Sequence, residues 1–167
     1  MNPKTVRVSY LELTQVPEAI PPHFGTERIS LEKLRVGEYL DLYERIGVPF
    51  RWDQRLRMLR SELIRLLASE RSRIHVLRDG DARAIGFCEF ELSSPDIELK
   101  NFGLVPAAQN RGLGSWLLRT ALHAEWKRQP GRIWLHTDDW DHPAAAHLYE
   151  SAGFCVYMIR EESPADL

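Results

Sequence analysis

The stretch QNRGLGSWLLRT, residues 109–120, places two glycines one residue apart directly before a helical pattern of apolar residues. The first turn of a helix has unpaired N–H groups and a positive dipole end, and it can therefore hold an anion. A loop that merely turns a corner is the alternative for such a Gly-x-Gly step. Two phosphate loops are excluded, because no lysine follows Gly114 and position 117, where a dinucleotide fingerprint needs its third glycine, is leucine. The residues alone therefore predict a loop that binds a phosphorylated cofactor.

Strand and helix patterns alternate on both sides of this loop. Apolar runs bounded by turn residues predict the strands, which are 6–13, 27–34, 97–105, 132–137, 155–160 and the two arms of a hairpin with an Asp-Gly turn within 73–92. Apolar residues at helical spacing predict helices over 112–128 and 142–153. The loop thus lies between a strand and a helix, where open α/β folds tend to bind ligands. The order of elements predicts one α/β domain.

Two further helices are expected in the first half of the chain. The first covers 38–46 and is stopped by Gly47 and Pro49, and its apolar face comprises Tyr39, Leu42, Tyr43 and Ile46. The second is capped by Asp53 and carries one apolar stripe, which comprises Leu56, Leu59, Leu63, Leu66 and Leu67. Leucines at this spacing indicate core packing rather than a cofactor site.

Composition narrows the class of protein. The chain has 167 residues, of which 44% are hydrophobic and 28% charged, and this balance is typical of one soluble globular domain. The formal net charge of -2 does not favour a nucleic-acid binder. No apolar run is long enough to span a membrane, and the N-terminal residues do not have the layout of a signal peptide. Cys88 and Cys155 lie in apolar runs without CxxC spacing, which favours buried thiols and a cytoplasmic protein.

Two motifs resemble those of a known family. QNRGLG (109–114) fits the [QR]-x-x-G-x-[GA] signature of the GNAT acetyltransferases, which hold the pyrophosphate of acetyl-CoA on this loop. HPAAAHLYESAGF (142–154) fits the second signature, N-x-x-A-x-x-L-Y-x-x-x-G-F, except that His142 stands in place of asparagine. The segment YLDLYERIGVPFRWDQR (39–55) is similar to Y-x-x-L-Y-x-x-V-G-x-x-W-x-W-x-x-R of a bacterial subgroup of unassigned substrate, with Phe50 in place of the first tryptophan.

This resemblance implies a GNAT-like acyl-CoA N-acyltransferase fold. In this α/β fold (an α+β mixed sheet), a central, twisted and mostly antiparallel sheet is splayed at the cofactor site and flanked by helices. The expected single domain spans 1–167. Within it, 35–70 is expected to form a two-helix acceptor-side region, 97–128 the strand and helix around the cofactor loop, and 132–160 a strand-helix-strand unit.

The resemblance also implies where acetyl-CoA binds as the acyl donor. Pantetheine is expected along the backbone of Leu104 and Val105, where the strands splay. The pyrophosphate is expected to meet backbone N–H groups of the loop, with Arg111 adding charge, and the cofactor-binding loop residues are Gln109, Asn110, Arg111, Gly112, Leu113, Gly114 and Ser115. His142 takes the place of an asparagine that contacts the cofactor, and its imidazole can still donate a hydrogen bond.

The chemistry of acetyl transfer requires the amine to lose a proton and favours protonation of the departing thiolate. By resemblance, Tyr149 is expected near the sulfur as the general acid. The alternative for Tyr149 is an aromatic ring that packs on the face of its helix.

The base is expected to be Glu98, which stands eleven residues before Gln109, as the catalytic glutamate of histone-type members does. On a regular strand Glu98 shares a face with Lys100, Phe102 and Leu104. The alternatives are a carboxylate paired with Lys100, a water chain with no dedicated base, and the competitors Glu89 and Glu91 on the preceding strand.

The expected reaction transfers the acetyl group to a primary amine by direct attack in a ternary complex. A sensor that binds CoA esters without turnover is the other function class, and the retained Tyr149 and the intact loop favour the enzyme. The acceptor is expected to be a small-molecule amine or a peptide or protein amine, bound by a monomer or homodimer, with no nucleic-acid or membrane partner. Trp52 and Trp140 are candidates for the wall of the acceptor pocket, and packing in the core is the alternative for Trp52. HTDDWDHP (136–143) matches no zinc or calcium loop, so no metal is expected.

Overall fold

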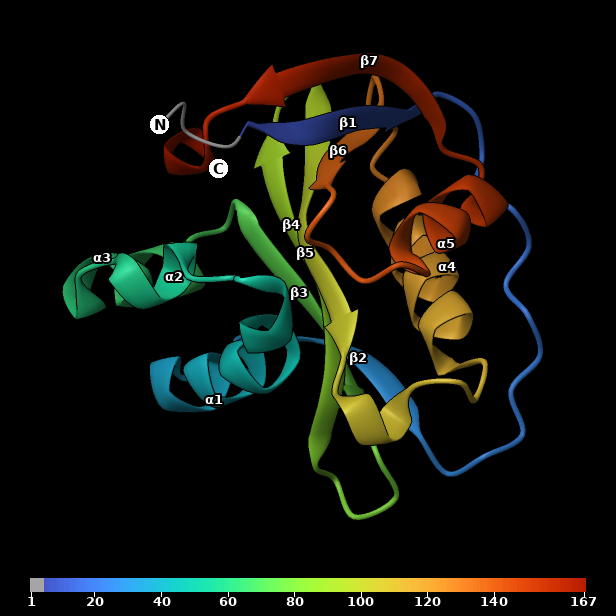
Figure 1. The fold of residues 1–167 in the computed structure, drawn as a ribbon. Coiled ribbons are helices and arrows are strands. Elements are labelled where there is room, and N and C mark those ends of the chain that lie inside the picture. Colours follow the sequence, from blue (N-terminus) through green and yellow to red (C-terminus); the bar gives the residue numbers. More distant parts are fainter. Residues whose placement is uncertain (1–4) are drawn as a thin grey trace.

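The computed structural model describes residues 5–167 and contains a seven-stranded sheet in the order β2-β3-β4-β5-β6-β1-β7 (Figure 1). Its strands are β1 (Val6–Leu13), β2 (Arg28–Glu32), β3 (Ser72–Arg78), β4 (Ala84–Ser93), β5 (Asp96–Leu104), β6 (Ile133–Asp138) and β7 (Cys155–Glu162). Neighbouring strands are antiparallel, apart from β5 and β6, which run parallel. The expected mixed and mostly antiparallel sheet is confirmed.

Helices cover both faces of the sheet (Figure 1). On one side lie α1 (Val36–Gly47), α2 (Gln54–Arg57) and α3 (Arg60–Ala68), and on the other lie α4 (Leu113–Trp126) and α5 (Ala145–Ala152). Short 3-10 turns complete the chain, namely η1 (Val48–Phe50), η2 (Pro106–Ala108) and η3 (Pro164–Asp166). No helix in residues 5–167 is long and apolar enough to cross a membrane.

Two glycines let the helical layers approach the centre of the sheet. A Cβ on Gly103 would lie 2.4 Å from Ile46 of α1, and a Cβ on Gly86 would lie 2.5 Å from Leu104 and 3.4 Å from Leu117 of α4. Side chains at these positions would therefore force the strands and helices apart. The two contacts also identify the faces, since Gly103 points toward α1 and Gly86 toward α4.

The sheet opens between β5 and β6. The registered pairs of these strands are Ile97 with Ile133 and Glu98 with Trp134, and residues 99–104 of β5 have no partner on β6. Because β5 pairs with β4 along its other edge as far as Leu104, its free edge faces the gap. The splayed sheet that the resemblance implied is confirmed.

A β-bulge changes the phase of β5 at Lys100. Asn101 pairs with Glu89 and Leu99 pairs with Phe90, which leaves Lys100 as the extra residue. A bulge of this kind shifts the alternation of the side chains beyond it by one residue.

The phase change corrects the expected face of Glu98. Glu98 lies on the same face as Asn101 and Gly103, which is the side of α1. Phe102 and Leu104 lie on the opposite face, toward α4 and α5. The prediction that Glu98 shares a face with Phe102 and Leu104 was wrong, because it assumed a regular strand.

The helix expected after Asp53 is also corrected. Met58 and Leu59 have extended backbones, with ψ of 148 and 136, and they separate α2 from α3. Asp53 makes no capping hydrogen bond, and Leu59 is 66% exposed. Leu63 and Leu67 are the buried members of the stripe. Two short helices therefore replace the single leucine-faced helix.

Most other predicted elements are confirmed. Helix α1 buries its expected apolar face and ends at Gly47. Helix α5 ends at Gly153, whose φ is +116, as a C-terminal glycine permits. The hairpin between β3 and β4 is present, and the Asp79 carboxylate accepts the amides of Asp81 and Arg83 at 2.9 Å each. Its turn is therefore longer than the Asp-Gly pair.

The two cysteines differ from the expectation of buried thiols. Cys88 is buried in β4, whereas Cys155 is exposed at the start of β7. Strand β7 lies at an edge of the sheet, and most of its side chains are exposed. An apolar run at such an edge therefore does not bury its thiol.

Candidate active site

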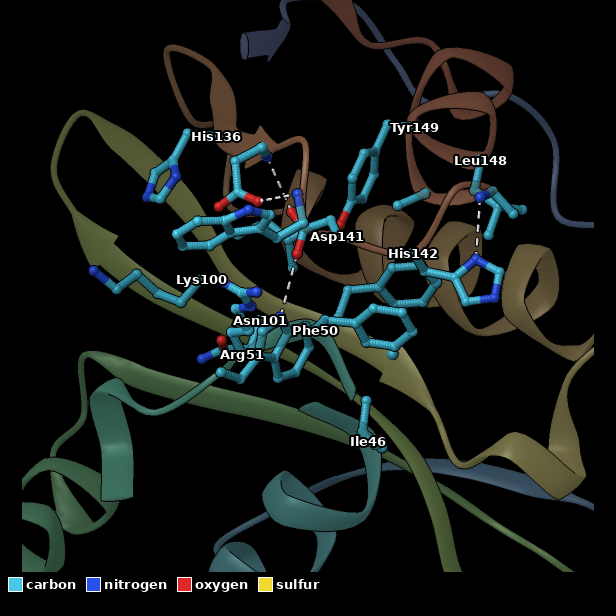
Figure 2. A pocket seen from close by; sticks show the side chains of 18 of the residues that line it. Ile46, Phe50, Arg51, Lys100, Asn101, His136, Asp141, His142, Leu148 and Tyr149 are labelled. Atoms are coloured by element: carbon cyan, nitrogen blue, oxygen red, sulfur yellow. Dashed lines mark hydrogen bonds between the residues drawn. The ribbon is translucent and has the colours of Figure 1, made fainter. Parts of the chain in front are cut away.

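A cavity of about 630 Å³ lies where β5 and β6 diverge. Its walls come from β5, the η1–α2 segment, the loop 109–115, and the loop from β6 into α5. Figure 2 shows side chains from these segments around one space, among them Asn101 of β5, Asp141 and Tyr149. The predicted cofactor loop and both predicted catalytic residues therefore border the same cavity.

The loop before α4 has the features of an anion site. Asn110 and Gly112 have left-handed backbones, with φ of 60 and +76. A Cβ on Gly112 would meet nothing within 4 Å, so this glycine borders open space. The amides of 113–115, in the first turn of α4, have no intrahelical acceptor and lie at the positive end of the helix dipole. This loop fits a pyrophosphate group.

Two loop residues offer the cavity no side chain. Leu113 is a core residue at 3% exposure, and Arg111 forms an ion pair with Glu27 at 2.5 Å. The charge expected from Arg111 is therefore engaged by a carboxylate. The loop residues that line the cavity are Gln109, Asn110, Gly112, Gly114 and Ser115.

A chain of hydrogen bonds joins the N-terminus of α5 to the end of β5. The Ala144 amide donates to His142 Nδ1 at 3.0 Å, so Nε2 carries the hydrogen and donates to Gln109 Oε1 at 3.1 Å. Gln109 Nε2 in turn donates to the Leu104 carbonyl at 3.3 Å. His142 and Gln109 therefore hold the cofactor loop against the open edge of β5.

Leu104 and Val105 differ in what their backbones can offer. The Val105 amide donates to the Ile85 carbonyl, and the Val105 carbonyl accepts from the Ala108 amide, both at 2.9 Å. Successive residues of a strand direct their backbone groups to opposite sides, so Leu104 faces the open edge. Of these two residues, Leu104 is the one whose backbone amide can pair with an extended ligand, while its carbonyl already accepts from Gln109.

Tyr149 lies in the cavity wall on α5. Its ring packs between Phe102 and Phe154, with centroids 5.9 and 6.0 Å away, and Figure 2 shows its hydroxyl directed into the cavity. Burial, followed by the negative charge of Asp141, raises the pKa of Tyr149, so the phenol stays protonated at neutral pH. The ring packs against other aromatic rings, as the packing role for Tyr149 requires. The hydroxyl carries its proton, as the role of a proton donor requires.

Among the three glutamates considered as base, Glu98 is the one that lines this cavity. Its side chain is 12% exposed, and burial raises its pKa, although Lys100 at 3.4 Å partly opposes that shift. Glu91 is 40% exposed and pairs with Arg71 and Lys100 outside the cavity. Of the three carboxylates, that of Glu98 therefore borders the cavity.

Glu89 belongs to a buried network behind the cavity wall. It is 1% exposed, and it accepts hydrogen bonds from Tyr39 at 3.0 Å, from Arg55 at 3.4 Å and from Asn101. Sequence reasoning missed this network, although Arg55 closes the 39–55 segment quoted above. Its members fix α1 and α2 to the sheet, because a buried carboxylate needs each of these donors.

Three pairs of side chains meet across the cavity between residues 50–52 and residues 140–142. They are Phe50 with His142 (ring centroids 5.4 Å apart), Arg51 with Trp140 (guanidinium 4.7 Å from the ring centroid) and Trp52 with Asp141 (Nε1 to Oδ1, 3.2 Å). We call these pairs the cross-cavity contacts. Trp52 and Trp140 both line the cavity, and Trp52 also packs on Tyr43 and Phe87 of the core, with ring centroids 5.6 and 6.5 Å away.

The acidic loop after β6 forms part of the cavity wall. Asp138 is half-buried, and burial together with the neighbouring Asp141 raises its pKa. Its carboxylate accepts the Trp140 amide at 2.7 Å. Within residues 5–167, no group of three or more His, Cys, Asp or Glu side chains is arranged to hold a metal ion.

This geometry agrees with comparisons to known proteins. The sequence model described as the Acetyltransferase (GNAT) family matches residues 35–154. The chain belongs to the GNAT family. Proteins of this GNAT fold carry out acyl-CoA-dependent acetyl transfer in general, and the family generally binds acetyl-CoA. A comparison with curated protein sequences gave no match.

Solved structures show the same fold at low identity. A GCN5-related N-acetyltransferase from Sphaerobacter thermophilus is 19% identical with a TM-score of 0.63, over 96% of this chain and 53% of that one. A putative GNAT acetyltransferase from Novosphingobium aromaticivorans is 18% identical with a TM-score of 0.65, over 93% and 62%. The ribosomal-protein-S18-alanine N-acetyltransferase from Escherichia coli is 20% identical with a TM-score of 0.58, over 75% and 77%. The chain thus spans between half and two thirds of the length of the first two GNAT structures.

Proposed function

We propose that this protein is an acetyl-CoA-dependent N-acetyltransferase that acetylates a primary amine by direct attack in a ternary complex. The observation that carries the proposal is the single cavity bordered by the anion loop, by the free edge of β5 at Leu104, and by Glu98 and Tyr149. Acetyl-CoA, when bound, supplies the activated acetyl group. The acceptor is a small-molecule amine or a peptide or protein amine.

The loop residues and Leu104 act as the binding elements in this proposal. Backbone amides of the loop hold the pyrophosphate, while His142 and Gln109 keep the loop in place through their hydrogen-bond chain. The backbone of Leu104 pairs with the pantetheine arm at the open edge of β5. Gly112 keeps the approach to these amides free of a side chain.

Glu98 and Tyr149 move the protons. Glu98 takes a proton from the acceptor ammonium, so that the nitrogen lone pair can form the new C–N bond as the C–S bond breaks. Tyr149 gives its hydroxyl proton to the departing sulfur. The position of Glu98 in the cavity supports a dedicated base over the competitors Glu89 and Glu91. The Tyr149 hydroxyl, which is protonated at neutral pH and directed into the cavity, supports its role as acid.

The cofactor part of the proposal is tested by ligand-induced stabilisation. A ligand selective for the native state stabilises it by about 2.7 kcal/mol at 100 times its Kd, so acetyl-CoA should raise the melting temperature. Gly112→Val should abolish this shift, because its side chain would fill the space before the loop amides. Gly112→Ala has the same positive φ with little added bulk and separates backbone strain from blocking.

The enzymatic part is tested by thiol release from acetyl-CoA with a panel of amines. Amine-dependent release supports the transferase. A full melting shift without release for any amine would favour the CoA-ester sensor instead. An unchanged shift in a folded Gly112→Val variant would remove the loop from the binding site.

A further inference from the structure

Arg51 stands out among the residues that line the cavity, because its backbone is left-handed. Its φ of 62 and ψ of 31 are uncommon for a residue other than glycine. Such a conformation costs free energy and persists only where its surroundings impose it. Here the Arg51 amide donates to the Val48 carbonyl at 3.2 Å, and both neighbours of Arg51 make cross-cavity contacts.

The guanidinium of Arg51 is held in place without a carboxylate. It lies over the Trp140 ring, an arrangement that stabilises a cation through the ring quadrupole and leaves the N–H donors free at the edge of the guanidinium plane. Within residues 5–167, no acidic side chain lies within ion-pair distance of it. Figure 2 shows Arg51 among the side chains that line the cavity.

The other lysine and arginine side chains that line the cavity are paired. Arg57 forms an ion pair with Asp53 at 3.2 Å, and Lys100 pairs with Glu98 and Glu91 at 3.4 Å each. Their charges are therefore compensated within the protein. Arg51 is thus the arginine in this wall whose donors are available to a ligand.

Carboxylates dominate the rest of the wall. An ammonium group of the acceptor would be attracted to the six acidic side chains that line the cavity, which are Asp53, Glu98, Asp138, Asp141, Glu162 and Asp166. A neutral or purely cationic amine would make no contact with the exposed Arg51 guanidinium, whose donors would then bond only to water. The charge pattern instead suits a ligand with an ammonium at one end and an anion at the other.

We propose that Arg51, stacked on Trp140, binds a carboxylate of the acceptor, so that the substrate is an amine that also carries a carboxylate, such as an amino acid or a short peptide. This inference rests on the proposed acetyltransferase function. The planar guanidinium matches a carboxylate with two parallel hydrogen bonds. A phosphate is the less suitable anion, because its greater charge would be repelled more strongly by the carboxylates of the wall.

The test compares acids with their matched amides. Thiol release is measured with L-phenylalanine, L-lysine, L-glutamate and glycyl-L-phenylalanine, each against its C-terminal carboxamide. Wild type should prefer the acid of at least one pair by about tenfold or more in kcat/KM, in the range of a charge-assisted hydrogen bond. Arg51→Gln should lose this preference through a higher KM for the acid, with a much smaller effect on the amide. Arg57→Gln, a change of the same kind at a paired arginine of the same wall, should keep the preference.

Several outcomes would overturn the inference while leaving the proposed function in place. Equal use of acid and amide by wild type would do so, as would an unchanged preference for the acid in Arg51→Gln. A loss of acetyl-CoA affinity in Arg51→Gln would show that Arg51 acts on the cofactor. An Arg51-dependent preference for O-phosphoethanolamine over ethanolamine would show that Arg51 binds a phosphate rather than a carboxylate. Turnover of none of the pairs, with the acetyl-CoA melting shift intact, would also overturn it. Absence of the melting shift itself would overturn the proposed function.

Discussion

Trp52 donates a hydrogen bond from its indole Nε1 to Asp141 across the cavity at 3.2 Å. Asp141 also accepts from the Thr137 hydroxyl at 2.5 Å and from the Asp138 amide at 3.2 Å. One carboxylate thus joins the acceptor-side segment to the end of β6. Burial is the main cause of the raised pKa of Tyr149, and the charge of Asp141 raises it further. Asp141 therefore connects its contact with Trp52 to the proposed proton donor.

Replacement of Tyr149 by phenylalanine should separate acid catalysis from packing. The ring contacts with Phe102 and Phe154 remain, so the fold and the acetyl-CoA affinity should change little. Turnover should fall by about 100-fold, as expected for loss of a general acid. Steady-state kinetics and acetyl-CoA titration measure the two effects, and Tyr157→Phe, at an exposed tyrosine outside the cavity, is the control. Near-normal turnover, with chemistry shown to limit the rate, would leave Tyr149 with a packing role alone.

Replacement of Glu98 by glutamine should change the pH dependence of the rate. Burial raises the pKa of Glu98, and only the carboxylate can accept a proton, so the wild-type rate should rise as pH increases through that raised pKa. Glu98→Gln should be strongly slowed near pH 7 at low amine concentration. Its rate should recover at higher pH, because more of the amine is then already neutral.

Glu91→Gln is the matched control for this profile. Glu91 pairs with Glu98 in the register of β4 and β5 but does not line the cavity. Its profile should keep the shape of the wild-type profile with a small displacement to lower pH, because the negative charge of Glu91 contributes to the raised pKa of Glu98. Parallel profiles for wild type and Glu98→Gln would instead favour a water relay.

His142 provides a test of the hydrogen-bond chain at the cofactor loop. His142→Ala removes the partner of both Gln109 and the Ala144 amide, so the Kd for acetyl-CoA should rise by about tenfold, the cost of a net hydrogen bond or two. His142→Asn can still accept from the Ala144 amide and should recover part of the affinity. Isothermal titration gives both values. Equal affinity of wild type and His142→Ala would show that the loop keeps its shape without this chain.

The buried Arg55–Glu89 pair and the exposed Arg57–Asp53 pair allow a stability comparison within one helix. Arg55→Met leaves the carboxylate of Glu89 without its charge partner, and such a loss typically costs about 3–5 kcal/mol of unfolding free energy. Arg57→Met removes an exposed pair and should cost less than about 1 kcal/mol. Urea denaturation measures both variants. Similar losses would mean that Tyr39 and Asn101 alone satisfy Glu89.

The elements of the fold could be predicted from sequence where local chemistry decides them. The glycine loop, the glycine after α5, and the apolar face of α1 each correspond to a physical requirement within a few residues. Helix α5 begins at Ala145, three residues later than the predicted start at 142. The break at Met58 and Leu59 could not be predicted in this way, because no proline or glycine marks it. The leucine spacing continues through the break, and tertiary packing decides which leucines are buried.

The candidate site was predicted more fully for the cofactor than for the acceptor. The loop and Tyr149 follow from short motifs, and the structure brings them to one cavity. The Arg51–Trp140 stack joins residues far apart in the sequence, and no local motif at either residue predicts the contact. The sequence leaves Glu89 a possible base, whereas in the structure its buried carboxylate accepts from Tyr39, Arg55 and Asn101. Burial of a strand glutamate depends on such partners from other elements.

Because Lys100 is an extra residue in β5, the two halves of the strand direct their polar and apolar side chains to opposite faces of the sheet. Before the bulge, Glu98 points to the face of the sheet that α1 covers. After it, Phe102 and Leu104 point to the opposite face, which α4 and α5 cover. Removing this single residue would restore a uniform alternation and turn the side chains of one half of the strand to the wrong face. The presence of one extra residue in β5, rather than its identity as lysine, therefore places the proposed base on the opposite face from the apolar packing around Tyr149.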